Sequence, residues 1–187
     1  VDCRAEHLVQ FAAMGSALAR VEFGHAQPRL GLLSNGSERE KGTALTRAAD
    51  EVLREMPSAD FEYVGYVEGS ELLAGAVDVV VTDGFSGNIA LKVLEGSISS
   101  FIEAIGPQIL PAQLRTHFDA DAYGGAPLMG VNGVAIIAHG ASTPAALLSA
   151  IELAHHFVAN GLTEALADAI GRHAKTEEAA RSGLFSR

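Results

Sequence analysis

The stretch Val77-Asp-Val-Val-Val-Thr-Asp-Gly-Phe-Ser-Gly-Asn-Ile-Ala-Leu-Lys92 decides the fold. Its apolar run around Val79–Val81 is typical of a strand buried on both faces, as in a parallel sheet covered by helices. Two glycines, a serine and an asparagine follow as a tight turn, and a helical pattern begins after them. The stretch therefore predicts a strand, a turn and a helix N-terminus in succession.

The turn in this stretch, from Asp83 to Asn88, is the first candidate site. Open α/β sheets bind ligands at the carboxyl ends of their strands, where the first N–H groups of the next helix are unpaired and the helix dipole is positive. Gly84 and Gly87 would let the backbone approach a ligand closely, and Ser86 can cap the helix or donate a hydrogen bond. An anion, above all phosphate, is the expected ligand. A capped strand-to-helix connection with no ligand has the same pattern.

The flanking sequence extends this unit into a layered α/β domain with a largely parallel sheet. Apolar spacing predicts helices over residues 5–23, 44–56 and 144–161, a further helix that follows the turn at Asn88 and ends near Ile105, and strands over residues 29–34, 61–67 and 133–138. Polar residues follow three of the predicted strands, at Asn35-Gly36, at Gly84-Phe85-Ser86-Gly87-Asn88 and at His139-Gly140. Since the carboxyl ends of parallel strands meet at one edge of a sheet, we expect the three turns to form one cleft.

Composition limits the possible functions. The chain has 187 residues, which predicts one domain, and its net charge of −10 opposes general binding to nucleic acid. No apolar stretch is long enough to span a membrane, and no signal-peptide pattern is visible, so we expect a cytoplasmic protein. Cys3 is the only cysteine, which excludes an internal disulfide.

Several catalytic motifs can be tested against the sequence. No dinucleotide fingerprint, P-loop or metal-ligand pattern occurs, so we expect neither a cofactor nor a metal. The turn nearly matches the serine-hydrolase elbow, with Ser86 as nucleophile, Asp119 or Asp121 as the acid and His139 as the base, but Asn88 replaces the final glycine. Lys41 lies beside Gly42 after the first predicted strand, and it is either a surface charge or a ligand contact.

Four segments together resemble the phosphate acyltransferase PlsX family. They are the stretch from Val77 to Asn88, Tyr123-Gly-Gly-Ala-Pro-Leu-Met-Gly-Val-Asn-Gly133, Ala138-His-Gly-Ala-Ser142 and the leader Val1-Asp-Cys-Arg-Ala-Glu-His-Leu-Val-Gln-Phe-Ala12. The resemblance covers residues 1–173, as the carboxy-terminal part of a PlsX-like domain, and leaves residues 174–187 as a charged tail that we expect to fray.

The resemblance implies a function, a fold and partners. The function is transfer of an acyl group from acyl carrier protein to inorganic phosphate, forming acyl phosphate for phospholipid synthesis. The fold is a three-layer α/β/α sandwich like that of isocitrate and isopropylmalate dehydrogenases and of phosphotransacetylases. A homodimer, peripheral membrane contact and contact with a glycerol-3-phosphate acyltransferase are also implied.

The residues can be given roles in such a reaction. Phosphate bound at a helix N-terminus can attack a thioester without a protein nucleophile, provided that the enzyme positions it and stabilises the oxyanion. We expect Asn35 and the turn of Asp83, Gly84, Phe85, Ser86 and Gly87 to bind phosphate or substrate. Lys41 would neutralise the phosphate, Asn88 would orient phosphate or carbonyl, and His139 would be a general acid or base or an oxyanion donor.

Two departures from the family pattern and two alternative functions remain. The family's amino-terminal half is missing, and the segment from Ile105 to Tyr123 is shorter than the family's helical hairpin. A phosphotransacetylase that uses acyl-coenzyme A would have the same fold. A non-catalytic module that binds phosphate or acyl carrier protein is the second alternative.

Overall fold

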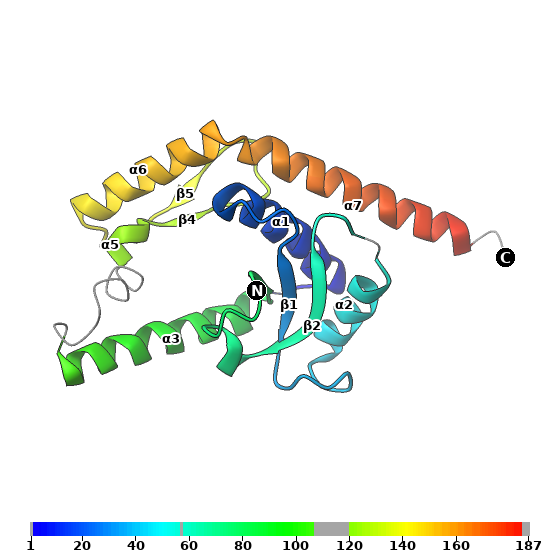
Figure 1. Cartoon of the computed structure of the whole chain (residues 1–187), viewed down its shortest axis with the longest axis horizontal. Helices are drawn as coiled ribbons and strands as arrows, with labels where there is room; N and C mark the ends of the chain where they lie inside the picture. Colours follow the sequence, from blue (N-terminus) through cyan, green and yellow to red (C-terminus); the bar gives the residue numbers. More distant parts are fainter. Residues whose placement is uncertain (1, 57, 107–119, 185–187) are drawn as a thin grey trace. The chain divides into compact units, whose positions relative to one another are not determined.

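The computed structural model describes residues 2–56, 58–106 and 120–184, and Figure 1 shows their helices and strands. The chain forms two compact units. The first consists of Val1–Gly87 and Glu164–Arg187, and the second of Asn88–Thr163. The predicted α/β class with a parallel sheet is confirmed in the first unit.

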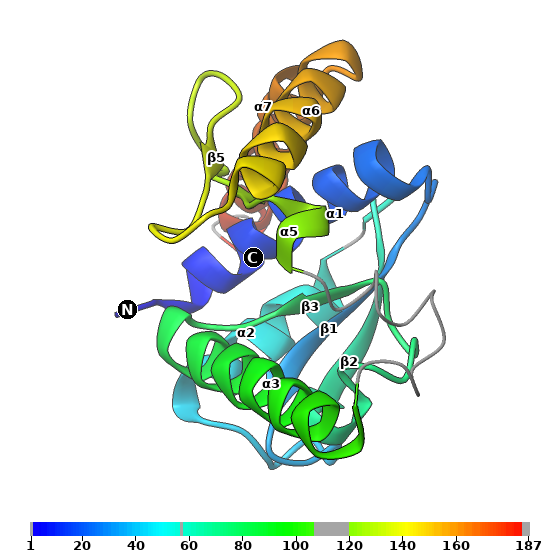
Figure 2. The same ribbon diagram turned by 90° about the vertical axis from the view of Figure 1, so that its left-hand side faces the viewer.

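The first unit is built on three parallel strands. Strands β1 (Arg29–Ser34), β2 (Glu62–Glu68) and β3 (Val79–Val81) lie in the order β2-β1-β3, side by side in Figure 2. The Arg29 guanidinium donates to the Asp78 carboxylate at 2.9 and 3.2 Å, and the backbone N–H of Asp78 donates to the Arg29 carbonyl oxygen at 2.9 Å. These bonds fix the beginning of β3 against the beginning of β1, although β3 is short.

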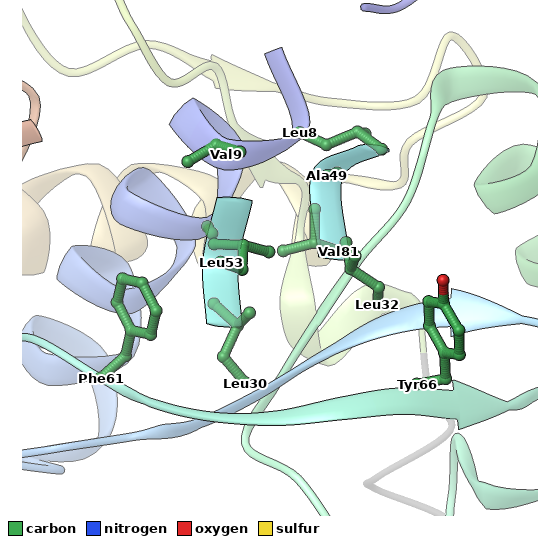
Figure 3. Close-up of a cluster of buried hydrophobic side chains, with 10 residues drawn as sticks. Leu8, Val9, Leu30, Leu32, Ala49, Leu53, Phe61, Tyr66 and Val81 are labelled. Carbon is green, nitrogen blue, oxygen red and sulfur yellow. The ribbon is translucent and has the colours of Figure 1, made fainter. Parts of the chain in front are cut away.

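Helices α1 (Ala5–Phe23) and α2 (Ala44–Glu55) pack on this sheet. The chain leaves α1 through Gly24, whose φ of 69° favours glycine, and Thr43 caps α2 by accepting a hydrogen bond from the N–H of Thr46. Figure 3 shows apolar side chains of both helices pointing toward side chains of the strands. The core consists of Leu8, Val9, Ala12, Leu30, Leu32, Ala49, Leu53, Phe61, Tyr66 and Val81.

The rest of the first unit comprises the short 3-10 helix η1 (Gly69–Glu71) and most of helix α7 (Leu162–Leu184). Leu166 and Ala169 of α7 are buried, and the Arg172 guanidinium donates twice to the Asp60 carboxylate, at 2.8 and 3.1 Å. Helix α7 ends at Leu184, and the expected fraying of residues 174–187 stays a prediction.

The second unit contains helix α3 (Gly84–Ile105) from Asn88 onward, helices α5 (Ala120–Tyr123) and α6 (Pro144–Ala159), and strands β4 (Ala126–Pro127) and β5 (Ile136–Ile137). Strands β4 and β5 pair antiparallel. The chain between α5 and β4 passes very close to α6, because a Cβ atom at Gly124 would lie only 2.3 Å from the backbone nitrogen of Ala150. Only glycine fits at this contact.

The last predicted strand differs from the expectation. A buried strand was predicted over residues 133–138, but β5 comprises only Ile136–Ile137, it pairs with β4, and the Ile137 side chain is 57% exposed. An apolar run favours a strand without specifying which strand it will pair with. Strand β5 is therefore not part of the parallel sheet of the first unit, so the parallel order of that sheet does not place His139 at the edge where the other two turns lie.

Helices α3 and α6 are more exposed than their sequences suggest. Leu147, Leu148, Ile151 and Val158 of α6 and Ile89, Leu91, Val93 and Phe101 of α3 are all exposed apolar side chains. Among the described residues, no helix is long and apolar enough to cross a bilayer. Most of the segment from Ile105 to Tyr123, including residues 107–119, lies outside the described residues.

Candidate functional site

The loop after β1 holds Lys41 over the end of that strand. The Asn35 side-chain oxygen accepts a hydrogen bond from the N–H of Gly42 at 2.9 Å, which closes the loop. Inside it, the Lys41 stem packs so tightly that a Cβ atom at Gly36 would lie 2.8 Å from Lys41 Cγ. Lys41 itself is exposed and forms no ion pair with any described residue. Its ammonium group is available to bind an anion.

The turn after β3 is closed by Asp83. One Asp83 oxygen accepts hydrogen bonds from the backbone N–H groups of Phe85 at 2.9 Å and Ser86 at 2.8 Å. Burial alone would raise the pKa of Asp83, but the hydrogen bonds from Ser86 and Phe85 outweigh it and hold that pKa below its usual value. Asp83 is therefore an ionised helix cap.

This capping changes the role expected for the turn. Two of the N–H groups predicted to hold phosphate already donate to the Asp83 carboxylate. Gly87 also has a packing role, because a Cβ atom there would lie 2.4 Å from Thr82 Cγ2. A phosphate at this helix start would have to displace the Asp83 carboxylate or share these N–H groups with it.

The turns after β1 and β3 do meet at one edge of the sheet. The two strands are neighbours and parallel, with Leu32 of β1 opposite Val81 of β3. Asn35 follows β1 by one residue and Asp83 follows β3 by two. The structure thus brings Asn35, Lys41 and the turn from Asp83 to Gly87 to the same end of the first unit.

Asn88 and His139 belong to the second unit, where they line one hollow of about 900 Å³. Its wall is made of Asn88, Leu91, Lys92, Glu95, Tyr123, Gly124, Gly125, Ala126, Ile137, Ala138, His139, Ala141, Ser142 and Ala146. The polar groups Asn88, His139 and Ser142 thus share the hollow with apolar side chains, an arrangement common in small-molecule sites.

The turn that carries His139 holds the imidazole in a defined orientation. The Nδ1 atom of His139 accepts a hydrogen bond from the N–H of Ala141 at 3.1 Å, and the His139 carbonyl oxygen accepts one from the N–H of Ser142 at 3.0 Å. Directly after this turn, Thr143 caps α6 by accepting from the N–H of Ala146 at 3.1 Å. The His139 ring therefore lies on a turn that leads directly into the capped N-terminus of α6.

Sequence reasoning did not identify Lys92 and Tyr123, which line the same hollow. Lys92 lies four residues after Asn88 in α3, so helical spacing could have placed both on one face. The Lys92 ammonium donates to the Glu95 carboxylate at 2.8 Å. Tyr123 begins one of the four segments that resemble the family, and that segment was the signal that could have identified it.

The structure gives no support to a serine-hydrolase elbow. Ser86 lies in the first turn of α3 with its N–H donated to Asp83, and no described non-glycine residue has a positive φ. A nucleophile elbow needs a strained turn between strand and helix. The proposed acids Asp119 and Asp121 have side chains outside the described part of the chain. Within the described residues, no cluster of three or more His, Cys, Asp or Glu side chains could hold a metal ion.

Comparison with known proteins identifies the family. The sequence pattern of the family described as "Fatty acid synthesis protein" matches residues 1–165. A phosphate acyltransferase of Myxococcus xanthus is 46% identical over 191 residues, which cover 93% of this chain and 53% of that protein. A phosphate acyltransferase of Citrifermentans bemidjiense is 41% identical over 203 residues, covering 98% and 55%, and one of Thermobifida fusca is 42% identical over 191 residues, covering 94% and 53%.

The chain thus spans about half the length of the curated relatives it matches. The matched residues include both strand-end turns of the first unit and the hollow of the second. The chain therefore belongs to the fatty acid synthesis protein family, the phosphate acyltransferase (PlsX) family that its motifs resemble.

Proposed function

We propose that this chain is part of a phosphate acyltransferase that transfers an acyl group from acyl carrier protein to inorganic phosphate, forming acyl phosphate for phospholipid synthesis. The observation that carries the proposal is the match of the family over residues 1–165, which include every residue with an assigned role. The relatives named phosphate acyltransferase support the reaction class.

The roles follow from the chemistry of each group. Phosphate is anionic, and Lys41 offers an ammonium group without an ion pair among the described residues, at the sheet edge that also carries Asn35 and Ser86. The thioester carbonyl needs hydrogen-bond donors as it becomes an oxyanion, and the hollow lined by Asn88 and His139 offers them. No residue of the chain has to form a covalent intermediate. We therefore assign Lys41 to phosphate, Asn88 to phosphate or the carbonyl, and His139 to the reacting carbonyl.

The proposal also covers the specific fold type, the location and the partners of the protein. We infer a three-layer α/β/α sandwich of the isocitrate dehydrogenase type, a homodimer, a cytoplasmic location with peripheral membrane contact, and contact with a glycerol-3-phosphate acyltransferase. The exposed apolar side chains of α3 and α6 favour burial against another chain or surface, which supports the part of the proposal that concerns assembly.

The roles of Lys41 and Asn88 can be tested by single substitutions in the full-length protein. We expect Lys41→Ala and Asn88→Ala each to lower kcat/KM for acyl phosphate formation about 100-fold, because each removes a group that binds charge developing in the reaction. Arg39→Ala is the matched control, since it removes an exposed cation from the same loop. Unchanged rates in both site variants, with folding intact by circular dichroism, would exclude these residues from the mechanism.

The choice of acyl donor decides between this function and its alternatives. A thiol-release assay with the full-length protein should show faster turnover with acyl-acyl carrier protein than with acyl-coenzyme A. The reverse preference would indicate a phosphotransacetylase. Phosphate or carrier-protein binding without thiol release from either donor would indicate a non-catalytic binding module.

A further inference from the structure

We infer that His139 acts as a neutral hydrogen-bond donor through its Nε2–H, stabilising the oxyanion, and that it is not a general base. This inference rests on the proposed function and narrows the three roles that the sequence left open for His139. It follows from the way in which the turn after β5 uses the other ring nitrogen.

A hydrogen bond from the backbone defines the tautomer of the His139 ring. The N–H of Ala141 points at Nδ1 of His139 with a nitrogen-to-nitrogen distance of 3.1 Å. A backbone N–H can only donate, so Nδ1 must accept and cannot carry a hydrogen. In a neutral imidazole, the single N–H is then on Nε2.

The two ring nitrogens of His139 differ in whether a substrate can reach them. Nδ1 faces the backbone of its own turn, and the turn is closed by a second hydrogen bond from the N–H of Ser142 to the carbonyl oxygen of His139. Nε2 lies on the edge of the ring away from the main chain. Since His139 lines the hollow, Nε2–H is the group that it can offer there.

The proposed reaction needs a hydrogen-bond donor at the carbonyl oxygen and no base on the protein. An oxygen of monohydrogen phosphate attacks the thioester carbonyl carbon, and the carbonyl π electrons move to its oxygen as negative charge. When the C=O bond re-forms, the C–S bond breaks, and the leaving thiolate takes the proton that the phosphate carried. The products are acyl phosphate and a thiol, so no proton has to pass to the protein. The oxyanion requires a donor, which Nε2–H supplies.

A general base at this position would conflict with the observed hydrogen bonds. To accept a proton from a group in the hollow, Nε2 would need a free lone pair, and the hydrogen would have to move to Nδ1. Two N–H groups, those of His139 and Ala141, would then face each other at 3.1 Å. The other titratable groups that line the hollow are Lys92, Glu95 and Tyr123, and Lys92 is paired with Glu95.

Amide side chains offer a sharp test in the full-length protein. Glutamine can place an N–H near the position of Nε2 and has no basic nitrogen, whereas asparagine reaches only as far as Nδ1. We expect His139→Gln to keep kcat for acyl phosphate formation within about 10-fold of wild type, while His139→Asn and His139→Ala lose about 100-fold or more. His155→Gln, an exposed histidine of α6, is the matched control and should be unchanged.

A second measurement reads the tautomer directly. In the full-length protein with 15N-labelled histidine, the His139 spectrum of the neutral ring should show the hydrogen on Nε2. A hydrogen on Nδ1 would overturn the inference, and so would a His139→Gln variant that folds but is as slow as His139→Ala. If the wild-type protein forms no acyl phosphate, the proposed function fails, and the catalytic role fails with it, while the NMR result still decides the tautomer.

Discussion

The two units of the chain contain similar apolar residues, which are buried in the first unit and largely exposed on the helices of the second. In the first unit, Leu8, Leu30 and Leu32 are fully buried between two helices and a three-stranded sheet. In the second unit, Ile151 of α6 and Val93 of α3 are 67% and 62% exposed. The contrast teaches that apolar composition shows only how much surface a helix can bury. The helix buries that surface only where a second element lies against it.

The difference has a topological cause. In the first unit, α2 connects two parallel strands, so the chain itself brings a helix back over the sheet. In the second unit, β4 and β5 form a sheet of only two short strands, which offers little surface for α3 and α6 to cover. Ala146, Ala150 and Phe157 are the buried side chains of α6, and they define one face of that helix.

The largest predicted effect compares a buried and an exposed side chain. Leu32→Ala should lower the free energy of unfolding by about 3 kcal/mol, because it leaves a cavity in the core. Ile151→Ala should lower it by less than about 0.5 kcal/mol, because its side chain is already largely in water. Urea denaturation of both variants measures the difference. Equal losses would contradict the comparison and would indicate that another surface covers α6.

A smaller effect is expected at the tightest contact of the second unit. Gly124→Ala should destabilise α6 by about 2 kcal/mol, because its Cβ atom would overlap backbone atoms of Ala146 and Ala150, and its φ of 68° disfavours any other residue. Gly96→Ala is the control. A Cβ atom there meets nothing within 4 Å, so the substitution should stabilise α3 by up to about 1 kcal/mol.

Hydrogen exchange of the α6 and α3 amides would resolve these two effects locally. If the α6 amides of the Gly124→Ala variant are protected from exchange as well as in the wild type, the backbone around residue 124 must shift to make room for the Cβ atom. The second unit would then be less rigidly packed than the first.

The smallest predicted effect concerns acid stability in the first unit. Hydrogen bonds from the Arg29 side chain and backbone lower the pKa of Asp78 to about 2. Because the pKa is lower in the folded state than the usual value near 3.8, the ion pair stabilises the fold above about pH 4, and this stabilisation is lost as the pH falls toward 2.

Replacing Asp78 by Asn should therefore lower stability at pH 7 by on the order of 1 kcal/mol, since Arg29 is partly exposed and water screens the pair. The gap between the variant and the wild type should shrink at pH 2 to 3. A gap that does not depend on pH in thermal unfolding would show that the charge of Asp78 is not the source of its effect.

Much of the fold could be predicted because its signals are local. The expected bounds of α1 and β1 agree with the structure, since Gly24 ends the helix and Asn35-Gly36 follows the strand. A helix after β3 was also expected, but α3 already begins at Gly84, so the glycines, serine and asparagine expected to form a turn are the first residues of the helix. The parallel order of β1 and β3 also explains why the residues after both strands lie at one sheet edge. That Lys41 and the turn from Asp83 to Gly87 bind phosphate stays a prediction.

By itself, the sequence determined the helices, the parallel strands and the family, because periodicity, turn residues and motifs act over short stretches of chain. Only the tertiary structure decided that β5 pairs with β4, that Asp83 occupies the first N–H groups of α3, and that Nδ1 of His139 accepts from Ala141. Strand pairing and hydrogen-bond direction depend on where other groups lie in space. A residue pattern shows which donors and acceptors exist, and the folded geometry decides which of them are still free to meet a substrate.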